Sequence, residues 1–174
     1  HKEKVKIAAR SIVKTDILRG KHKKLDQVTD GGGYFECPDS GSWTHRTNAE
    51  AHHHGRFFNN LVNDFLKKKN LNFNQVNLTV DSNEKLSWED EILKYDFRQF
   101  HNAHAILILM SRAAHRQLPR AERDPLTLYE KKMSFKCYAT GFHFDGTKIR
   151  KRSYINNSQL AFNFLGRVGF EHTR

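Results

Sequence analysis

The chain has 174 residues, of which 37% are hydrophobic and 13 are phenylalanine, so it has the size and apolar content of a folded domain rather than of a disordered segment. Its longest apolar stretch, residues 103–110, is far shorter than the roughly 20 apolar residues that a membrane-spanning helix needs, so we expect no membrane partner. The net charge of +11 and the pI near 9.8 favour polyanionic partners.

The positive charge is concentrated toward the two ends of the chain. Residues 1–24 carry nine Lys and Arg against two acids, and residues 125–174 carry nine against three. Charge blocks at both ends are common in proteins that bind nucleic acid. The two cysteines, Cys37 and Cys137, are too few for a disulfide scaffold and indicate a reducing, intracellular compartment.

The first predicted element is a helix over residues 2–19. Apolar residues recur there at helical spacing from Val5 to Ile17, and Gly20 is a natural stop. A strand through Val5–Ile7 is the alternative interpretation. In either case residues 1–24 form a basic arm or helix, which we expect to precede a single domain over residues 25–174.

The next segment, residues 25–46, is predicted to be a loop with one short strand at Tyr34–Cys37. Residues 48–69 then give the clearest helical pattern. Thr47 or Asn48 is a suitable cap, and the apolar stripe that follows has the spacing of a buried helix face. The stripe consists of Phe57, Phe58, Leu61, Val62, Phe65 and Leu66.

The middle of the chain mixes strand and helix patterns. Residues 71–80 alternate apolar and polar with one slip at Gln75, which predicts a strand, and residues 88–100 predict a helix. Residues 103–110 fit a buried strand or a buried helix equally well. Residues 111–118 then predict a helix that ends before Pro119.

The last third of the chain is predicted to be rich in antiparallel strands, with Asp145-Gly146 as a hairpin signal. The fold expected from the whole pattern is therefore α+β in a single domain, with a helix-rich N-terminal two thirds. The candidate strands are residues 126–129, 133–140, 148–155 and 160–165.

The strand at residues 148–155 carries the strongest candidate for a nucleic-acid contact. Lys148, Arg150 and Arg152 alternate along it, which places them on one face about 7 Å apart, close to the spacing of phosphates. Tyr154 continues the row and could stack on a base. The further candidate nucleic-acid-binding residues are Lys2, Lys4, Lys6, Arg10, Lys14, Arg19, Lys21, Lys23, Lys24, Lys131, Lys132, Lys136 and Lys151.

Eleven histidines are an unusual number for this length. Cys37, His45 and the run His52, His53 and His54 are the candidate ligands of a zinc ion, because thiolate and imidazole are the groups that zinc prefers. Their spacing matches no established zinc pattern. We therefore expect no cofactor and interpret these histidines as polar residues on the first turns of a helix.

A histidine-dependent nuclease is a further alternative. One nuclease core combines a histidine base on a hairpin with a ligand histidine on a helix, and we find no such order of elements around His52–His54 in the sequence. The function favoured by the basic ends is a structural nucleic-acid-binding protein, with RNA preferred to DNA, that is part of a ribosome-like ribonucleoprotein and contacts its other proteins. The remaining alternative is a viral coat protein that packages a genome. The sequence therefore favours a binding protein over an enzyme.

Overall fold

The computed structural model describes residues 1–81, 84–118, 128–137, 142–144 and 149–151, and the chain divides into two compact units, His1–Ala139 and Thr140–Arg174. The described residues form helices and antiparallel sheets, so the protein is of mixed α+β type. Within them, no helix is long and apolar enough to cross a membrane. The predicted strand at residues 160–165 lies outside the described residues, as does most of the last third, whose predicted richness in strands stays a prediction.

The first unit is built on a three-stranded antiparallel sheet in the order β3-β6-β7, with two separate antiparallel hairpins, β1–β2 and β4–β5. The second unit contains the antiparallel pair β8–β9. The elements, in chain order, are α1 Lys2–Val28, β1 Tyr34–Glu36, β2 Trp43–His45, the 3-10 turn η1 Arg46–Asn48, β3 Ala49–His54, α2 Phe58–Lys68, the 3-10 turn η2 Phe73–Gln75, β4 Leu78–Val80, β5 Leu86–Trp88, α3 Glu91–His104, β6 Ile106–Ser111, α4 Arg112–Gln117, α5 Leu128–Met133, β7 Ser134–Phe135, β8 Phe142–Phe144 and β9 Ile149–Lys151.

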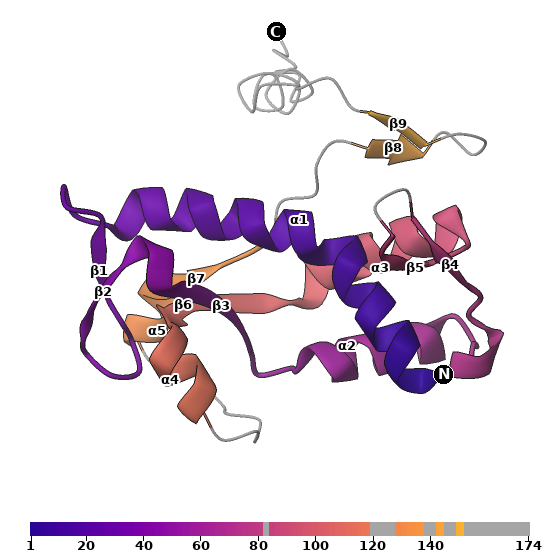
Figure 1. Ribbon diagram of the computed structural model, residues 1–174, viewed down its shortest axis with the longest axis horizontal. Helices are drawn as coiled ribbons and strands as arrows, with labels where there is room; N and C mark the ends of the chain where they lie inside the picture. The colour runs from indigo at the N-terminus through magenta and orange to yellow at the C-terminus, as the bar shows by residue number, and fades with distance from the viewer. Residues whose placement is uncertain (82–83, 119–127, 138–141, 145–148, 152–174) are drawn as a thin grey trace, which may run out of the picture. The chain divides into compact units, whose positions relative to one another are not determined.

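Helix α1 connects two hydrophobic cores. Its first half buries Val5, Ala8, Ala9 and Val13 against α2, α3 and β5, and its second half buries Leu25 against the three-stranded sheet. Figure 1 shows α1 as one long helix that runs from the region of α2 and α3 along β6 and β7. The residues predicted as a basic arm or helix are therefore part of a helix that packs on both cores.

Helix α1 does not end at Gly20, as the sequence pattern predicts, but continues to Val28. The glycine lies where α1 approaches β7. A Cβ atom at this position would be 3.0 Å from the Lys136 carbonyl oxygen and 3.0 Å from Phe135 Cδ2. Gly20 is therefore required for close packing of a helix on a strand and does not terminate the helix.

We expect the substitution Gly20→Ala to lower the free energy of unfolding by about 1–2 kcal/mol, because strain in a close-packed contact outweighs the roughly 1 kcal/mol gain in helix propensity. Urea unfolding monitored by circular dichroism measures the change. Gly31→Ala is the matched control, since a Cβ there meets no atom within 4 Å. A Gly20→Ala protein more stable than the wild type would show that helix propensity dominates at this site.

Three other sequence predictions are corrected by the structure. Residues 49–54, predicted as the start of a helix, form strand β3, and the helix begins only at Phe58. The predicted strand at 71–80 is a strand only over Leu78–Val80, because a capping box between Asn72 and Gln75 folds the preceding residues into a 3-10 turn. The predicted strand at 126–129 is wrong at residues 128 and 129, which belong to helix α5; residues 126 and 127 lie outside the described residues.

The remaining elements agree with the patterns more closely. The apolar stripe of α2 is confirmed as core, with Phe58, Leu61 and Phe65 among its buried residues. Helix α3 starts at Glu91 instead of residue 88, because Asp90 accepts hydrogen bonds from the backbone of the first turn. The ambiguous segment at 103–110 contributes strand β6, and α4 follows it directly as a helix.

Candidate functional site

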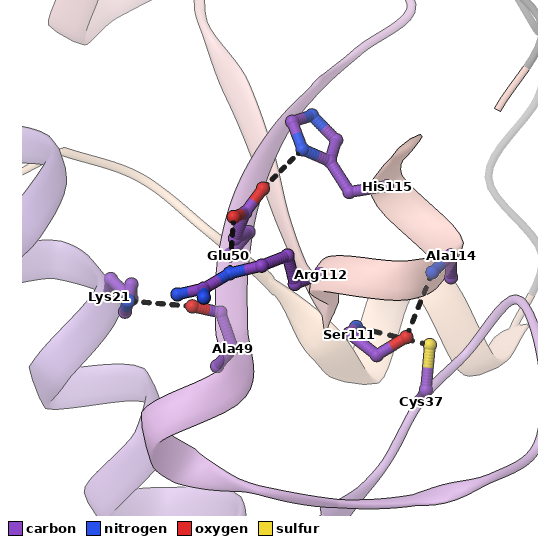
Figure 2. A network of polar contacts seen from close by, with 8 residues as sticks. All are labelled: Lys21, Cys37, Ala49, Glu50, Ser111, Arg112, Ala114 and His115. Carbon is purple, nitrogen blue, oxygen red and sulfur yellow. Dashed lines mark hydrogen bonds and ion pairs between the residues drawn. The ribbon is translucent and has the colours of Figure 1, made fainter. Parts of the chain in front are cut away.

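Strand β3, strand β6 and helix α4 together bring four polar side chains to one place. Glu50 and His52 share one face of β3, because residues two apart on a strand point the same way. Strand β6 pairs antiparallel with β3, with Glu50 opposite Met110, and α4 starts directly after β6. The first turn of α4 therefore places Arg112 and His115 beside Glu50 (Figure 2).

The carboxylate of Glu50 is the centre of this arrangement. His115 Nδ1 donates a hydrogen bond to Glu50 Oε2 at 2.6 Å, and Arg112 Nε donates to Glu50 Oε1 at 3.0 Å. The His52 ring lies edge-on to the His115 ring, with 5.3 Å between the ring centroids. We call Glu50, Arg112 and His115 the Glu50 cluster; their side chains are 31%, 48% and 35% exposed, so solvent and a substrate can reach them.

The charges of the Glu50 cluster fix the proton positions. Burial raises the pKa of Glu50, but the hydrogen bonds and charges of His115 and Arg112 outweigh this effect and hold the pKa below its usual value. The ionised carboxylate accepts hydrogen bonds only, so His115 carries a proton on Nδ1. A neutral His115 then has its lone pair on Nε2, which can accept a proton from water or a hydroxyl group.

Backbone contacts hold the elements of the site in register (Figure 2). Ser111 Oγ accepts a hydrogen bond from the Ala114 N–H at 3.1 Å and caps α4. The Ser111 N–H donates to Cys37 Sγ at 3.3 Å. Lys21 Nζ, from α1, donates to the Ala49 carbonyl at 2.7 Å beside Glu50. The site is therefore supported by segments from three parts of the chain.

The candidate zinc ligands are not gathered at one point. Cys37 is buried and accepts the hydrogen bond from Ser111, whereas His45 lies against the Tyr34 ring at the β1–β2 hairpin. His53 faces away from His52 and contacts His101. Of the residues that the structure describes, no three His, Cys, Asp or Glu side chains are arranged to hold a metal ion. Glu50 and His115 carry oxygen and nitrogen atoms of the kind that coordinate metal ions, and two of these atoms are hydrogen-bonded to each other.

A second histidine pair lies on the opposite face of β3. The Nε2 atoms of His53 and His101 are 2.9 Å apart, so one donates a hydrogen bond to the other. Burial is the main cause that lowers the pKa of His53 to about 3 and the pKa of His101 to about 4. Both rings are therefore neutral at neutral pH. His101 is fully buried, and we assign this pair a structural role.

Because of the His53–His101 pair, we expect the free energy of unfolding to decrease in acid. The folded pKa values of His53 and His101 lie below the ordinary value of 6.5, so the unfolded chain binds protons first as the pH falls. The stabilisation is complete above about pH 7 and decreases below the unfolded pKa, by about 2 kcal/mol per histidine at pH 5. Urea unfolding across this pH range measures it. A double variant, His53→Leu with His101→Leu, should lose less stability in acid, and an equal loss would contradict the assignment.

The predicted basic residues fall into three groups. Those on α1 include exposed residues such as Lys4, Lys14 and Arg19, whereas Arg10 stacks on the Phe58 ring with 4.6 Å between the guanidinium carbon and the ring centroid. Exposed side chains are also found at Lys131, Lys132 and Lys136. The third group is the predicted row of basic side chains on residues 148–155. For Arg150 and Lys151 the structure describes only the backbone, as part of β9, and Lys148, Arg152 and Tyr154 lie outside the described residues.

Sequence reasoning did not single out the Glu50 cluster. It read residues 48–69 as one helix, and it therefore missed that His52 lies on a strand whose partner leads directly into a helix with His115. This arrangement differs from the nuclease core considered in the sequence analysis, because β3 and β6 are paired but do not form a hairpin: residues 55–105 lie between them. The available signal was the alternation Glu50-x-His52 together with Ser111 as a cap for a helix that contains Arg112 and His115.

Comparisons of the chain with protein-family models, with curated proteins and with solved structures find no match. The inference of function therefore depends on the geometry and chemistry of the site alone.

Proposed function

We propose that this protein binds nucleic acid and cleaves its phosphodiester backbone at the Glu50 cluster. The observation that carries the proposal is the 2.6 Å hydrogen bond from His115 to Glu50, with Arg112 on the same carboxylate. A carboxylate that orients an imidazole is a common way to build a general base. An arginine beside it supplies the positive charge that a phosphate needs.

Each residue of the Glu50 cluster has a separate role in the proposed hydrolysis. His115 Nε2 accepts a proton from a water molecule as the water oxygen forms a bond to phosphorus. Arg112 uses one N–H on Glu50 and has further N–H groups for the phosphate oxygens, whose charge grows in the transition state. The bond from phosphorus to the leaving oxygen breaks, and that oxygen takes a proton from solvent. Glu50 stabilises the imidazolium formed on His115.

Charge supports nucleic acid as the substrate. The chain carries a net +11, and exposed Lys4, Lys14 and Arg19 on α1 supply charge outside the cluster. Such residues raise the local concentration of a polyanion and contact its phosphates without reading its sequence. The same observation favours a second candidate function, a structural RNA-binding component of a ribonucleoprotein that performs no chemistry.

One experiment separates the two candidates. The full chain is mixed with end-labelled single-stranded RNA, single-stranded DNA and duplex DNA over a salt series, with Mg²⁺ or with EDTA, and the products are separated on a gel. We expect affinity to fall steeply with salt because bound phosphates release counterions, and we expect cleavage products. Binding with intact nucleic acid would contradict the proposed hydrolysis and favour the structural candidate. Absence of binding at low salt would contradict both.

The samples that contain EDTA show whether cleavage requires a divalent cation. Cleavage that continues in EDTA would assign the reaction to acid–base catalysis by the side chains alone. Cleavage that requires a divalent cation would add a metal-ligand role for Glu50 and His115, whose oxygen and nitrogen donors suit such ions.

A further inference from the structure

An open pocket of about 560 Å³ lies between the β1–β2 hairpin and helix α4. Its volume is within the range of small-molecule sites, roughly 300–1,000 Å³. Aromatic and basic side chains line it, among them Tyr34, Trp43, His45, Arg112 and Arg116. We call this the aromatic–arginine pocket. Arg112 both lines the pocket and contacts Glu50, so the pocket and the Glu50 cluster share this residue.

Trp43 is the most exposed large hydrophobic side chain among the described residues, at 65%. The hairpin explains its position: Phe35 and Thr44, which are paired across the strands, are buried, so Tyr34 and Trp43 lie on the outer face. Tryptophan is normally well buried, and exposing so large an apolar ring is unfavourable in the absence of a partner. The outer face of the hairpin therefore presents a flat aromatic surface for a ligand.

The opposite wall of the pocket is basic. Arg112 and Arg116 are four residues apart on α4, so they lie on the same face of that helix, and both are exposed. Asn48 and His45 also line the pocket and supply polar groups that can hydrogen-bond to the edge of a base. A ligand that fits this lining has a flat ring, polar edges and a negative charge next to the ring.

We propose that the aromatic–arginine pocket binds an unpaired base of a single-stranded nucleic acid. The base stacks on Trp43, the phosphate beside it contacts Arg116, and the backbone continues past Arg112 to the Glu50 cluster. The inference rests on the proposed function and narrows its substrate to single strands. A base in a duplex is stacked on both faces and cannot offer a ring to Trp43, whereas unpaired bases stack readily on exposed aromatic side chains.

The tryptophan content makes a direct test possible. The chain has two tryptophans, and Trp88 is fully buried, with its indole N–H donating to the Val5 carbonyl at 3.0 Å. A change in tryptophan emission on adding a ligand therefore reports on Trp43. The full-length protein and its His115→Ala variant are each titrated with a single-stranded oligothymidylate and with a duplex of the same length, in EDTA, and gels confirm that the nucleic acid stays intact.

We expect quenching by the single strand and little change with the duplex. The Trp43 variants lack the reporting indole, so their affinity, and that of the wild type beside them, is measured by the fluorescence anisotropy of an end-labelled single strand. Trp43→Ala should weaken binding of the single strand by about 10- to 100-fold, since stacking on one aromatic side chain accounts for an effect of that order. Trp43→Phe should restore most of the affinity, which a merely structural role of the indole would not predict. Arg116→Ala should reduce the slope of log affinity against log salt by about one. Ile92→Ala is the control, because Ile92 is 52% exposed on α3, outside the pocket lining.

Binding at the aromatic–arginine pocket and cleavage at the Glu50 cluster are measured separately, so each of the two proposals can be contradicted without the other. Equal affinity of Trp43→Ala and wild type for the single strand, or a preference for the duplex, would overturn the pocket assignment even if the wild type cleaves nucleic acid. Quenching of Trp43 by the single strand without cleavage would support the pocket and contradict the hydrolytic function. No quenching by either nucleic acid would overturn the pocket assignment.

Discussion

Replacing His115 by alanine is expected to lower the rate of phosphodiester cleavage by about 10²–10⁴-fold, the range over which a positioned general base contributes. The physical reason is the loss of the group that takes the proton from the attacking water. Single-turnover rates on a labelled single strand measure the effect. The partly exposed position of His115 means that the substitution removes little core packing, so the variant should remain folded by circular dichroism.

Two further variants make this prediction specific. Glu50→Gln keeps the size of the side chain but removes the anion that orients and stabilises the imidazole, so we expect a smaller loss of rate. His104→Ala, an exposed histidine of α3 whose Nδ1 donates to the Phe100 carbonyl, should cleave at the wild-type rate. Wild-type cleavage by a folded His115→Ala protein would exclude the Glu50 cluster as the site of chemistry.

Replacing Asp16 by alanine is expected to lower the free energy of unfolding by about 3–5 kcal/mol, which is typical when one partner of a buried ion pair is removed. Asp16 lies on α1 with its side chain fully buried and accepts hydrogen bonds from both Arg98 Nε, at 2.5 Å, and Arg98 Nη2. Asn102 Nδ2 donates to the same carboxylate at 3.1 Å. The substitution leaves the guanidinium of Arg98, which is 15% exposed, without its carboxylate partner in the interior.

The chain contains a matched control for Asp16. Asp26, also on α1, pairs with Arg46 at 2.8 Å, but its side chain is 64% exposed. Exposed ion pairs contribute about 0–1 kcal/mol because water and salt screen them. Asp26→Ala should therefore unfold at nearly the same urea concentration as the wild type. Equal stabilities of the Asp16→Ala and Asp26→Ala proteins would contradict the role that we assign to the buried pair.

The fold was predictable where local spacing and burial agree. The stripe of α2 and the capped start of α4 belong to single elements, and their patterns are visible within one segment. Strand β3 was not predictable in this way. Asn48 and Glu50 resemble the cap and first turn of a helix, and only the pairing of β3 with the distant strand β6 makes the segment extended.

The candidate site was less predictable than the fold, since it depends on contacts between distant residues. Neither Glu50 nor Arg112 is unusual in its own sequence neighbourhood, and the hydrogen bond between them exists only once β3 and β6 are paired. The buried pair of Asp16 and Arg98 could not be predicted from the sequence for the same reason. Trp43 was likewise unremarkable in the sequence, because exposure of an aromatic ring becomes visible only in three dimensions.

The position of α1 in the chain has a consequence for how the protein forms during synthesis. A ribosome releases α1 before the residues that cover it, and Gly20 meets its partner Phe135 only after more than a hundred further residues have emerged. Contacts so distant along the chain are made slowly, because closing a long loop costs entropy before any burial compensates it. The nascent helix must therefore carry Val5 and Val13 uncovered until α2, β5 and α3 have emerged, and Leu25 uncovered until β6 and β7 follow. The many lysines of α1 repel neighbouring chains during that interval and so disfavour aggregation.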